Sequence, residues 1–263
     1  MMKIDLTHKK ALVGASTSGI GKAIALKLAE CGASVYLVAR NEAKLQSVTH
    51  MLDVSKGQEH KYVVADFNDF KNFKNSITEF LLKNPVDILV NNTQGPPSGT
   101  VLEKSHEDYQ QAFELLFQNI TSTSMAALPA MQHKKQGRII NVASISVKEP
   151  LAHLALSNTM RSAMVSWAKT LAGEVARDGV TVNTILTGYF DTERLNGLLK
   201  DQAMADGVSF SEIKKQKEAQ VPAQRFGKPE EYAYLVAFLA SDFAAYITGA
   251  NIPIDGGLLR SGW

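Results

Sequence analysis

Short apolar runs alternate with helix-patterned segments along nearly the whole chain of 263 residues. Between the runs, apolar residues recur at helical spacing, as in Ala168, Leu171, Ala172 and Val175. Runs that are apolar on both faces and separated by helices indicate a parallel sheet covered on both sides. Because crossovers between parallel strands are right-handed, we predict an α/β protein with a doubly wound sheet of about seven strands. The runs cover residues 10–13, 34–39, 62–65, 86–91, 137–142, 180–186 and 250–254.

Composition narrows the class of protein further. With 45% hydrophobic and 21% charged residues, the chain is typical of a globular protein with a sizeable core. A net charge of +2 favours neither a nucleic-acid nor a membrane partner. The single cysteine excludes an internal disulfide framework, and the histidines are too scattered for a metal site. Since no signal segment or long apolar span is present, we expect a cytoplasmic protein, with residues 1–263 forming one domain.

Residues 189–226 do not follow the alternation of strands and helices. This segment is long, contains two helical patterns separated by Gly207, and follows the carboxyl end of a predicted strand. Ligands bind at the carboxyl ends of strands in open α/β sheets, so we predict a helical lid over a substrate. A surface excursion without a role is the alternative.

A glycine-rich turn at residues 14–21 joins the first apolar run to the first helical pattern. A dinucleotide pyrophosphate requires this order of strand, turn and helix, because glycine lets the backbone approach the phosphates and the helix N-terminus offers free N–H groups. Many strand-to-helix turns nevertheless use glycine and bind nothing. The candidate cofactor-binding residues here are Gly14, Ser16, Ser18, Gly19, Ile20 and Gly21.

Further motifs follow in a fixed order and resemble the short-chain dehydrogenase/reductase family along nearly the whole chain. The resemblance includes 3-oxoacyl carrier-protein reductases, and it implies a Rossmann-like fold, hydride transfer between a nicotinamide and a carbonyl or alcohol substrate, and a homo-oligomer, either a dimer or a tetramer. A 3-oxoacyl thioester is one substrate that it suggests. The motifs lie at residues 63–66, 87–92, 137–144, 178–183, 187–189, 225–231 and 254–257.

The end of the second predicted strand indicates which nucleotide binds. Where an NAD-preferring member of the family has a carboxylate for the ribose 2′-hydroxyl, this chain has Ala39, followed by Arg40. No carboxylate is present here to repel a 2′-phosphate, and the forked guanidinium of Arg40 could bind one. The site therefore favours NADP(H) over NAD(H). A solvated arginine at a strand end is the alternative interpretation. Ser18 occupies a position in the turn where the family often has a second basic residue.

The resemblance assigns other residues to parts of the cofactor. Asp66, with Phe67 next to it, is assigned to the adenine, although a capping role for Asp66 is also open. The resemblance assigns the adenosine ribose to Asn92, Thr93 and Gln94. It assigns the nicotinamide to Thr187, Gly188 and Thr192.

The catalytic positions depart from the family pattern. The family uses a serine that polarises the carbonyl, a tyrosine that donates the proton, a lysine one turn later and an asparagine on an earlier helix. Ser144 matches the serine, but Ser157 and Arg161 replace the tyrosine and the lysine. Leu116 lies at the asparagine position, and Asn119 follows three residues later.

The proton path is therefore altered. An aliphatic hydroxyl such as Ser157 is a far weaker acid than a phenol. Arg161 keeps its proton, but it can bind the cofactor ribose or lower the pKa of a neighbour. Tyr189 and His153 are alternative proton donors, each of which could instead be a pocket wall or a loop residue.

Two functions remain open. The first is an NADP(H)-dependent oxidoreductase of the family type that uses Ser144, Ser157, Arg161 and Tyr189. The second is a nucleotide-binding pseudoenzyme or regulatory subunit without reductase activity. The sequence favours the enzyme, because its active-site residues are replaced and not deleted.

Overall fold

A single seven-stranded sheet forms the centre of the protein in a computed structural model that describes residues 3–260. Its strands are β1 (Lys10–Gly14), β2 (Ser34–Ala39), β3 (Lys61–Val64), β4 (Ile88–Asn91), β5 (Gly137–Val142), β6 (Val180–Thr187) and β7 (Asn251–Ile254). The strands lie in the order β3-β2-β1-β4-β5-β6-β7, and neighbouring strands are parallel. This is the order of a doubly wound sheet, and the predicted fold is confirmed.

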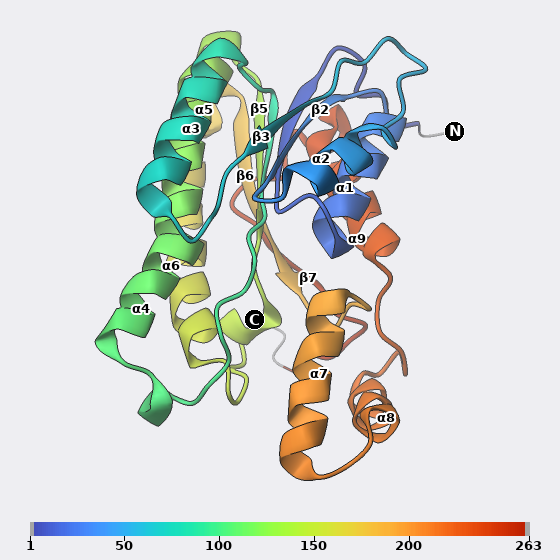
Figure 1. Cartoon of the computed structure of the whole chain (residues 1–263). Coiled ribbons are helices and arrows are strands. Elements are labelled where there is room, and N and C mark those ends of the chain that lie inside the picture. The colour runs from blue at the N-terminus through green and yellow to red at the C-terminus, as the bar shows by residue number, and fades with distance from the viewer. Residues whose placement is uncertain (1–2, 261–263) are drawn as a thin grey trace.

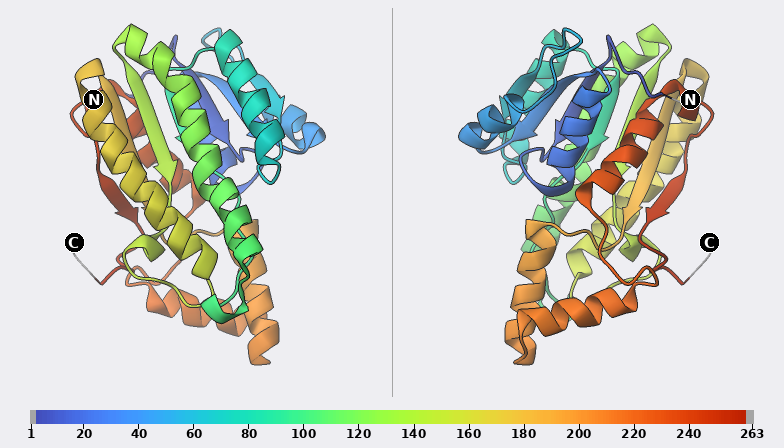
Figure 2. Two further views of the ribbon diagram at one scale, coloured as in Figure 1. Left: turned by 90° about the vertical axis from the view of Figure 1, so that its left-hand side faces the viewer. Right: turned by 90° about the vertical axis from the view of Figure 1, so that its right-hand side faces the viewer.

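Helices cover both faces of the sheet. The α-helices among the described residues are α1 (Gly19–Glu30), α2 (Glu42–Thr49), α3 (Phe70–Lys83), α4 (His106–Phe113), α5 (Asn119–Lys134), α6 (Ala155–Val175), α7 (Glu193–Asp206), α8 (Phe210–Gln220) and α9 (Pro229–Ala240). The core on one face includes α1, α2 and α9, and the core on the other includes α3, α5 and α6. Figure 2 shows α5 and α6 in front of the sheet in one view and α1 and α9 in front in the opposite view. None of the described helices is long and apolar enough to cross a bilayer.

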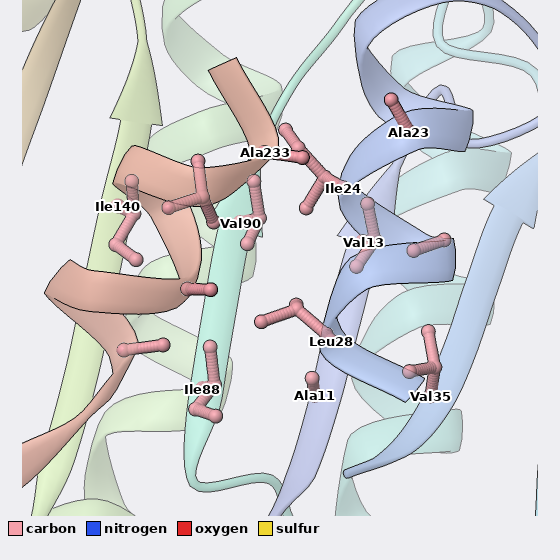
Figure 3. Packing of buried hydrophobic residues seen from close by; sticks show 14 of the residues in the cluster. Ala11, Val13, Ala23, Ile24, Leu28, Val35, Ile88, Val90, Ile140 and Ala233 are labelled. Atoms are coloured by element: carbon pink, nitrogen blue, oxygen red, sulfur yellow. The ribbon is translucent and has the colours of Figure 1, made fainter. Parts of the chain in front are cut away.

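The first face shows how the apolar pattern produces the packing. Ile24 and Leu28 lie one helical turn apart on α1, and both are fully buried. They pack against Val13 of β1 and Val90 of β4, with Ala233 of α9 beside them (Figure 3). This apolar layer fixes α1 against the sheet and thereby fixes where the glycine turn in front of α1 lies.

The segment after β6 leaves the sheet, and its two ends are joined outside the sheet by an isolated bridge. Phe190 and Gly227 form a parallel bridge, in which the Asp191 N–H donates to the Gly227 carbonyl at 2.9 Å. Between them, α7 and α8 share a small apolar core that includes Leu199 and Ile213. Figure 1 shows both helices beyond the carboxyl ends of β6 and β7. The segment therefore has the position predicted for a lid, and its movement remains a prediction.

Candidate active site

A cleft of about 860 Å³ opens at the carboxyl ends of the strands, a size that suits a small-molecule site. The glycine turn, the loop after β4, the end of β5, the start of α6 and the lid segment all contribute to its lining. The structure thus brings together most of the residues predicted from the sequence. Those that line the cleft are Ser18, Gly19, Ile20, Gly21, Asn92, Thr93, Gln94, Ser144, Ser157, Arg161, Thr187, Gly188, Tyr189 and Thr192.

The N-terminus of α1 faces this cleft with unused hydrogen-bond donors. The Ser18 side chain makes no capping bond, and in the described part of the chain no acceptor is bonded to the N–H groups of Gly19, Ile20 or Gly21. Such N–H groups, together with the positive end of the helix dipole, form a site for an anion. The residues present therefore fit the pyrophosphate of a dinucleotide.

Close backbone contacts explain two of the glycines in the turn. A Cβ at Gly14 would lie 2.3 Å from the carbonyl oxygen of Asn92, and a Cβ at Gly21 would lie 2.3 Å from that of Ala15. Neither position can hold a larger residue without backbone movement. Ala15 itself has a φ of 44°, a left-handed conformation that costs a non-glycine residue about 1–2 kcal/mol.

Three residues predicted to bind the cofactor lie outside this cleft for packing reasons. The Ser16 side chain is buried, accepts a hydrogen bond from the Val38 N–H at 3.1 Å and donates to the Val38 carbonyl at 3.4 Å. The Ser16 side chain therefore fastens the turn to β2, and its predicted role at the cofactor remains a prediction. Gly14 and Phe67 line a small separate cavity behind the loop that follows β4.

Arg40 and Asp66 lie just past the carboxyl ends of β2 and β3, outside the cleft lining. The Arg40 side chain is exposed. One oxygen of Asp66 accepts from the N–H and the side-chain amide of Asn68, at 3.0 and 3.1 Å. In the described residues the other carboxylate oxygen has no hydrogen bond, which leaves it available to a ligand. The predicted roles of Arg40 and Asp66 remain predictions.

Two hydroxyl groups and one guanidinium gather where the chemistry is expected. The Ser144 Oγ, just after β5, accepts from the Ser146 N–H at 3.1 Å. The Ser157 Oγ, in the first turn of α6, accepts from the Arg161 Nε at 3.1 Å. Because each oxygen already accepts a bond from the protein, each hydroxyl proton is free to point toward a ligand in the cleft.

Arg161 places a positive charge in the wall of the cleft. Its side chain is held one helical turn beyond Ser157, with Nη1 donating to the Val142 carbonyl at 2.6 Å. The residue is only 9% exposed, and within residues 3–260 no carboxylate forms an ion pair with it. Burial lowers the pKa of the guanidinium to about 10, and repulsion from Arg194 acts in the same direction. The group therefore stays charged at neutral pH.

Only one of the two alternative proton donors lies at the cleft. Tyr189 lines it and packs edge-on against Phe226, with the ring centroids 5.9 Å apart. Burial raises the pKa of the Tyr189 phenol, which makes it a weaker acid. His153 is exposed and does not belong to the cleft lining.

Asn119 does not replace the missing asparagine. Residues Glu114–Gln118 form one π-helical turn between α4 and α5, and Leu116 within it is fully buried. The Asn119 amide donates to the Phe67 carbonyl at 2.7 Å, on the side of the small cavity and not of the cleft. The side-chain amide that the family uses is therefore absent from this position of the cleft.

Arg194, which no sequence motif singled out, also lines the cleft. It is the second residue of α7, whose N-terminus is capped by the Thr192 side chain through the Leu195 N–H at 3.2 Å. Its Nη2 donates to the Pro96 carbonyl at 2.7 Å, across the cleft. The position of the lid decides which side of α7 faces the cleft, and no local pattern encodes that position.

The parallel sheet, the glycine turn and the open N-terminus of α1 define an α/β protein of the dinucleotide-binding class. A family model described as enoyl-(acyl carrier protein) reductase matches residues 14–259. The chain belongs to the short-chain dehydrogenase/reductase family, as its sequence motifs predicted.

Individual relatives match over nearly their full length. The 3-oxoacyl-[acyl-carrier-protein] reductase FabG of Vibrio cholerae is 36% identical over 256 residues, which are 97% of this chain and 99% of that protein. The NADPH-dependent reductase BacG of Bacillus subtilis is 29% identical and is covered completely, with 97% of this chain aligned. Among solved structures, the L-sorbose reductase of Gluconobacter frateurii, complexed with NADPH and L-sorbose, has a TM-score of 0.92 at 30% identity, with 99% of this chain and 100% of that chain covered.

Proposed function

We propose that the protein is an NADP(H)-dependent oxidoreductase that interconverts a carbonyl compound and its alcohol in the cleft. One observation carries the proposal: Ser144, Ser157 and Arg161 line the same cleft as the open N-terminus of α1. Similarity to reductases whose names or structures include NADPH supports the cofactor class. The alternative, a nucleotide-binding subunit without activity, gains no support from these relatives.

NADPH, when bound, supplies two electrons and one hydrogen to the carbonyl carbon. The chain would hold its pyrophosphate at the N–H groups of Gly19, Ile20 and Gly21, and its 2′-phosphate at Arg40. Ala39 places no negative charge beside that phosphate.

The protein groups would act on the carbonyl oxygen. As the oxygen gains negative charge, the Ser144 and Ser157 hydroxyls donate hydrogen bonds to it, and the Arg161 cation stabilises it in a site of low polarity. The proton that completes the alcohol would come from water through Ser157, or from Tyr189. Because the Arg161 Nε donates to the Ser157 Oγ and so polarises its hydroxyl, we favour the path through Ser157.

The direct test is to follow NADPH oxidation with acetoacetyl thioesters and a panel of ketones and quinones. Turnover of at least one of these compounds is expected. Tight NADPH binding without turnover of any of them would contradict the proposal and would favour the subunit without activity.

Variants separate the two proton paths. We expect Ser157→Ala to lower kcat/KM by about 10- to 100-fold, because the site loses both a donor and the link to Arg161. Tyr189→Phe is expected to lower it by less than about threefold, since proton transfer from a phenol of raised pKa contributes little. Steady-state kinetics at saturating NADPH measure both. A larger loss of kcat/KM in Tyr189→Phe than in Ser157→Ala would place Tyr189 on the proton path.

Arg40 can be tested by binding alone. We expect Arg40→Ala to raise the Kd of NADPH by about 10- to 100-fold, the usual effect of losing charge-assisted hydrogen bonds, with little change for NADH. Arg177→Ala, which removes another exposed arginine outside the cleft lining, is the matched control. Tighter binding of NADH than of NADPH by the unmodified protein would contradict the cofactor assignment.

A further inference from the structure

Arg194 enters the cleft from the lid with most of its hydrogen-bonding capacity unused. Nη2 bonds to the Pro96 carbonyl, and a Cβ at Gly95 would lie only 3.2 Å from the same nitrogen, so the guanidinium rests against this loop. Hydrogen bonds of Nε and Nη1 do not occur among the described residues. A guanidinium has five N–H donors in a fixed plane, and this arrangement leaves an edge free for a ligand.

The two arginines of the cleft form no ion pair within residues 3–260. The charged residues in the cleft lining are Arg161, Arg194 and Glu193, and the Asp201 carboxylate acts on Arg194 from outside the lining. Glu193 is exposed in the first turn of α7, and no ion pair joins it to either arginine within residues 3–260. The repulsion between Arg161 and Arg194, which lowers the pKa of Arg161, shows that their fields overlap in the cleft.

Apolar residues form part of the cleft lining, together with hydroxyl and amide groups such as those of Thr192 and Asn92. Arg194 itself is exposed, so a ligand can reach its guanidinium from solvent. A planar, forked cation at the edge of such a cleft matches a carboxylate, which can accept two parallel hydrogen bonds from it. The apolar lining residues include Leu115, Leu151, Leu154, Leu195 and Leu198.

We propose that the substrate carries a carboxylate in addition to its carbonyl group, and that Arg194 binds this carboxylate while the carbonyl oxygen lies toward Ser144 and Arg161. The proposal rests on the oxidoreductase function proposed above and specifies its substrate class as small oxo acids. Arg194 is then the residue that determines specificity, and Arg161 acts on the reacting oxygen. Because Arg194 belongs to the lid and contacts the loop after β4, binding of the carboxylate would also hold these two sides of the cleft together.

A pair of substrates that differ only in charge tests the proposal. With NADPH, kcat/KM for acetoacetate is expected to exceed that for methyl acetoacetate by at least about tenfold. Arg194→Gln is expected to lower the value for the acid by about 10- to 100-fold, and that for the ester by less than about threefold. Arg194→Lys keeps the charge but loses the forked pair of donors. Its kcat/KM for the acid is expected to lie between those of the unmodified protein and of Arg194→Gln. Lys200→Gln, which removes an exposed cation elsewhere on α7, is the matched control. A preference for the ester, or equal losses on both compounds, would overturn the proposal.

A binding measurement separates this proposal from the proposed function. Calorimetry can compare malonate with neutral malonamide, each titrated into the complex of the protein with NADP⁺. We expect malonate alone to bind, and we expect Arg194→Gln to weaken it at least about tenfold, whether or not any ketone is turned over. If Arg194→Gln instead weakens NADP⁺ binding and leaves malonate unaffected, Arg194 is a cofactor residue and the proposal is wrong.

Discussion

Replacement of Gly14 by alanine is expected to lower the free energy of unfolding by about 1–3 kcal/mol and to weaken NADPH binding at least about tenfold. The added Cβ would lie 2.3 Å from the Asn92 carbonyl oxygen, and neither atom can move without moving the backbone that carries it. Relief of this overlap requires β1 and the loop after β4 to move apart. The glycine turn and Asn92 both contribute to the cofactor site, so stability and affinity would fall together. Urea unfolding and a fluorescence titration with NADPH measure the two effects.

Gly173→Ala is the matched control for this substitution. Gly173 lies exposed on α6, and a Cβ added there would meet no atom within 4 Å. Because glycine in a helix costs about 0.5–1 kcal/mol relative to alanine, this variant should be more stable than the unmodified protein. If Gly14→Ala matched the stability of Gly173→Ala, the close contact at Asn92 would not constrain the turn.

Replacement of Arg161 by methionine is expected to lower kcat/KM by about 10²- to 10³-fold, the usual effect of removing one group that stabilises a developing oxyanion. The variant keeps the length and apolar character of the side chain but loses the charge and both hydrogen bonds. The affinity for NADPH is expected to fall by less than about tenfold, since the pyrophosphate site at α1 is untouched. Pre-steady-state kinetics and a NADPH titration separate the two effects.

The pH dependence gives a second measurement of the same charge. Because burial lowers the pKa of Arg161 to about 10, the cation is present below this pH and is lost as the pH rises through it. Activity of the unmodified protein should therefore fall near pH 10, and this fall should be absent in Arg161→Met. Arg161→Lys should retain a cation and show the fall at a lower pH, because burial lowers the pKa of lysine below its usual value. Identical profiles for all three proteins would exclude a role for the charge.

The sequence was sufficient for the fold because its strands are buried on both faces. The run at 34–39 is apolar from Val35 to Ala39, and β2 has the same bounds. Across all seven runs, the predicted and observed strands differ by no more than two residues at either end. Strands of a parallel sheet can be located in this way, because burial on both faces requires unbroken apolar runs.

The site was less predictable because tertiary contacts decide which side chains face the cleft. The turn at 14–21 was predicted from its glycines, yet Ser16 within it points inward to the β2 backbone. The three-residue spacing of Leu116 and Asn119 suggested a shared helix face, but a π-helical turn between them changes the register. Arg194 had no motif to identify it, because its position depends on how the lid packs.

The bridge between Phe190 and Gly227 bears on how the segment between these residues can change in evolution. The bridge joins the two ends of the intervening segment where it leaves β6 and enters α9, and bonds from Arg194 to the Pro96 carbonyl and from Ala223 to the Gly256 carbonyl tie the segment to the rest of the protein. A change of length or fold within residues 190–227 would have to keep or replace these two bonds, whereas the turn at 14–21 is held by backbone contacts that leave no room for a Cβ at Gly14 or Gly21. Substrate preference can diverge on such a scaffold while the nucleotide site stays the same.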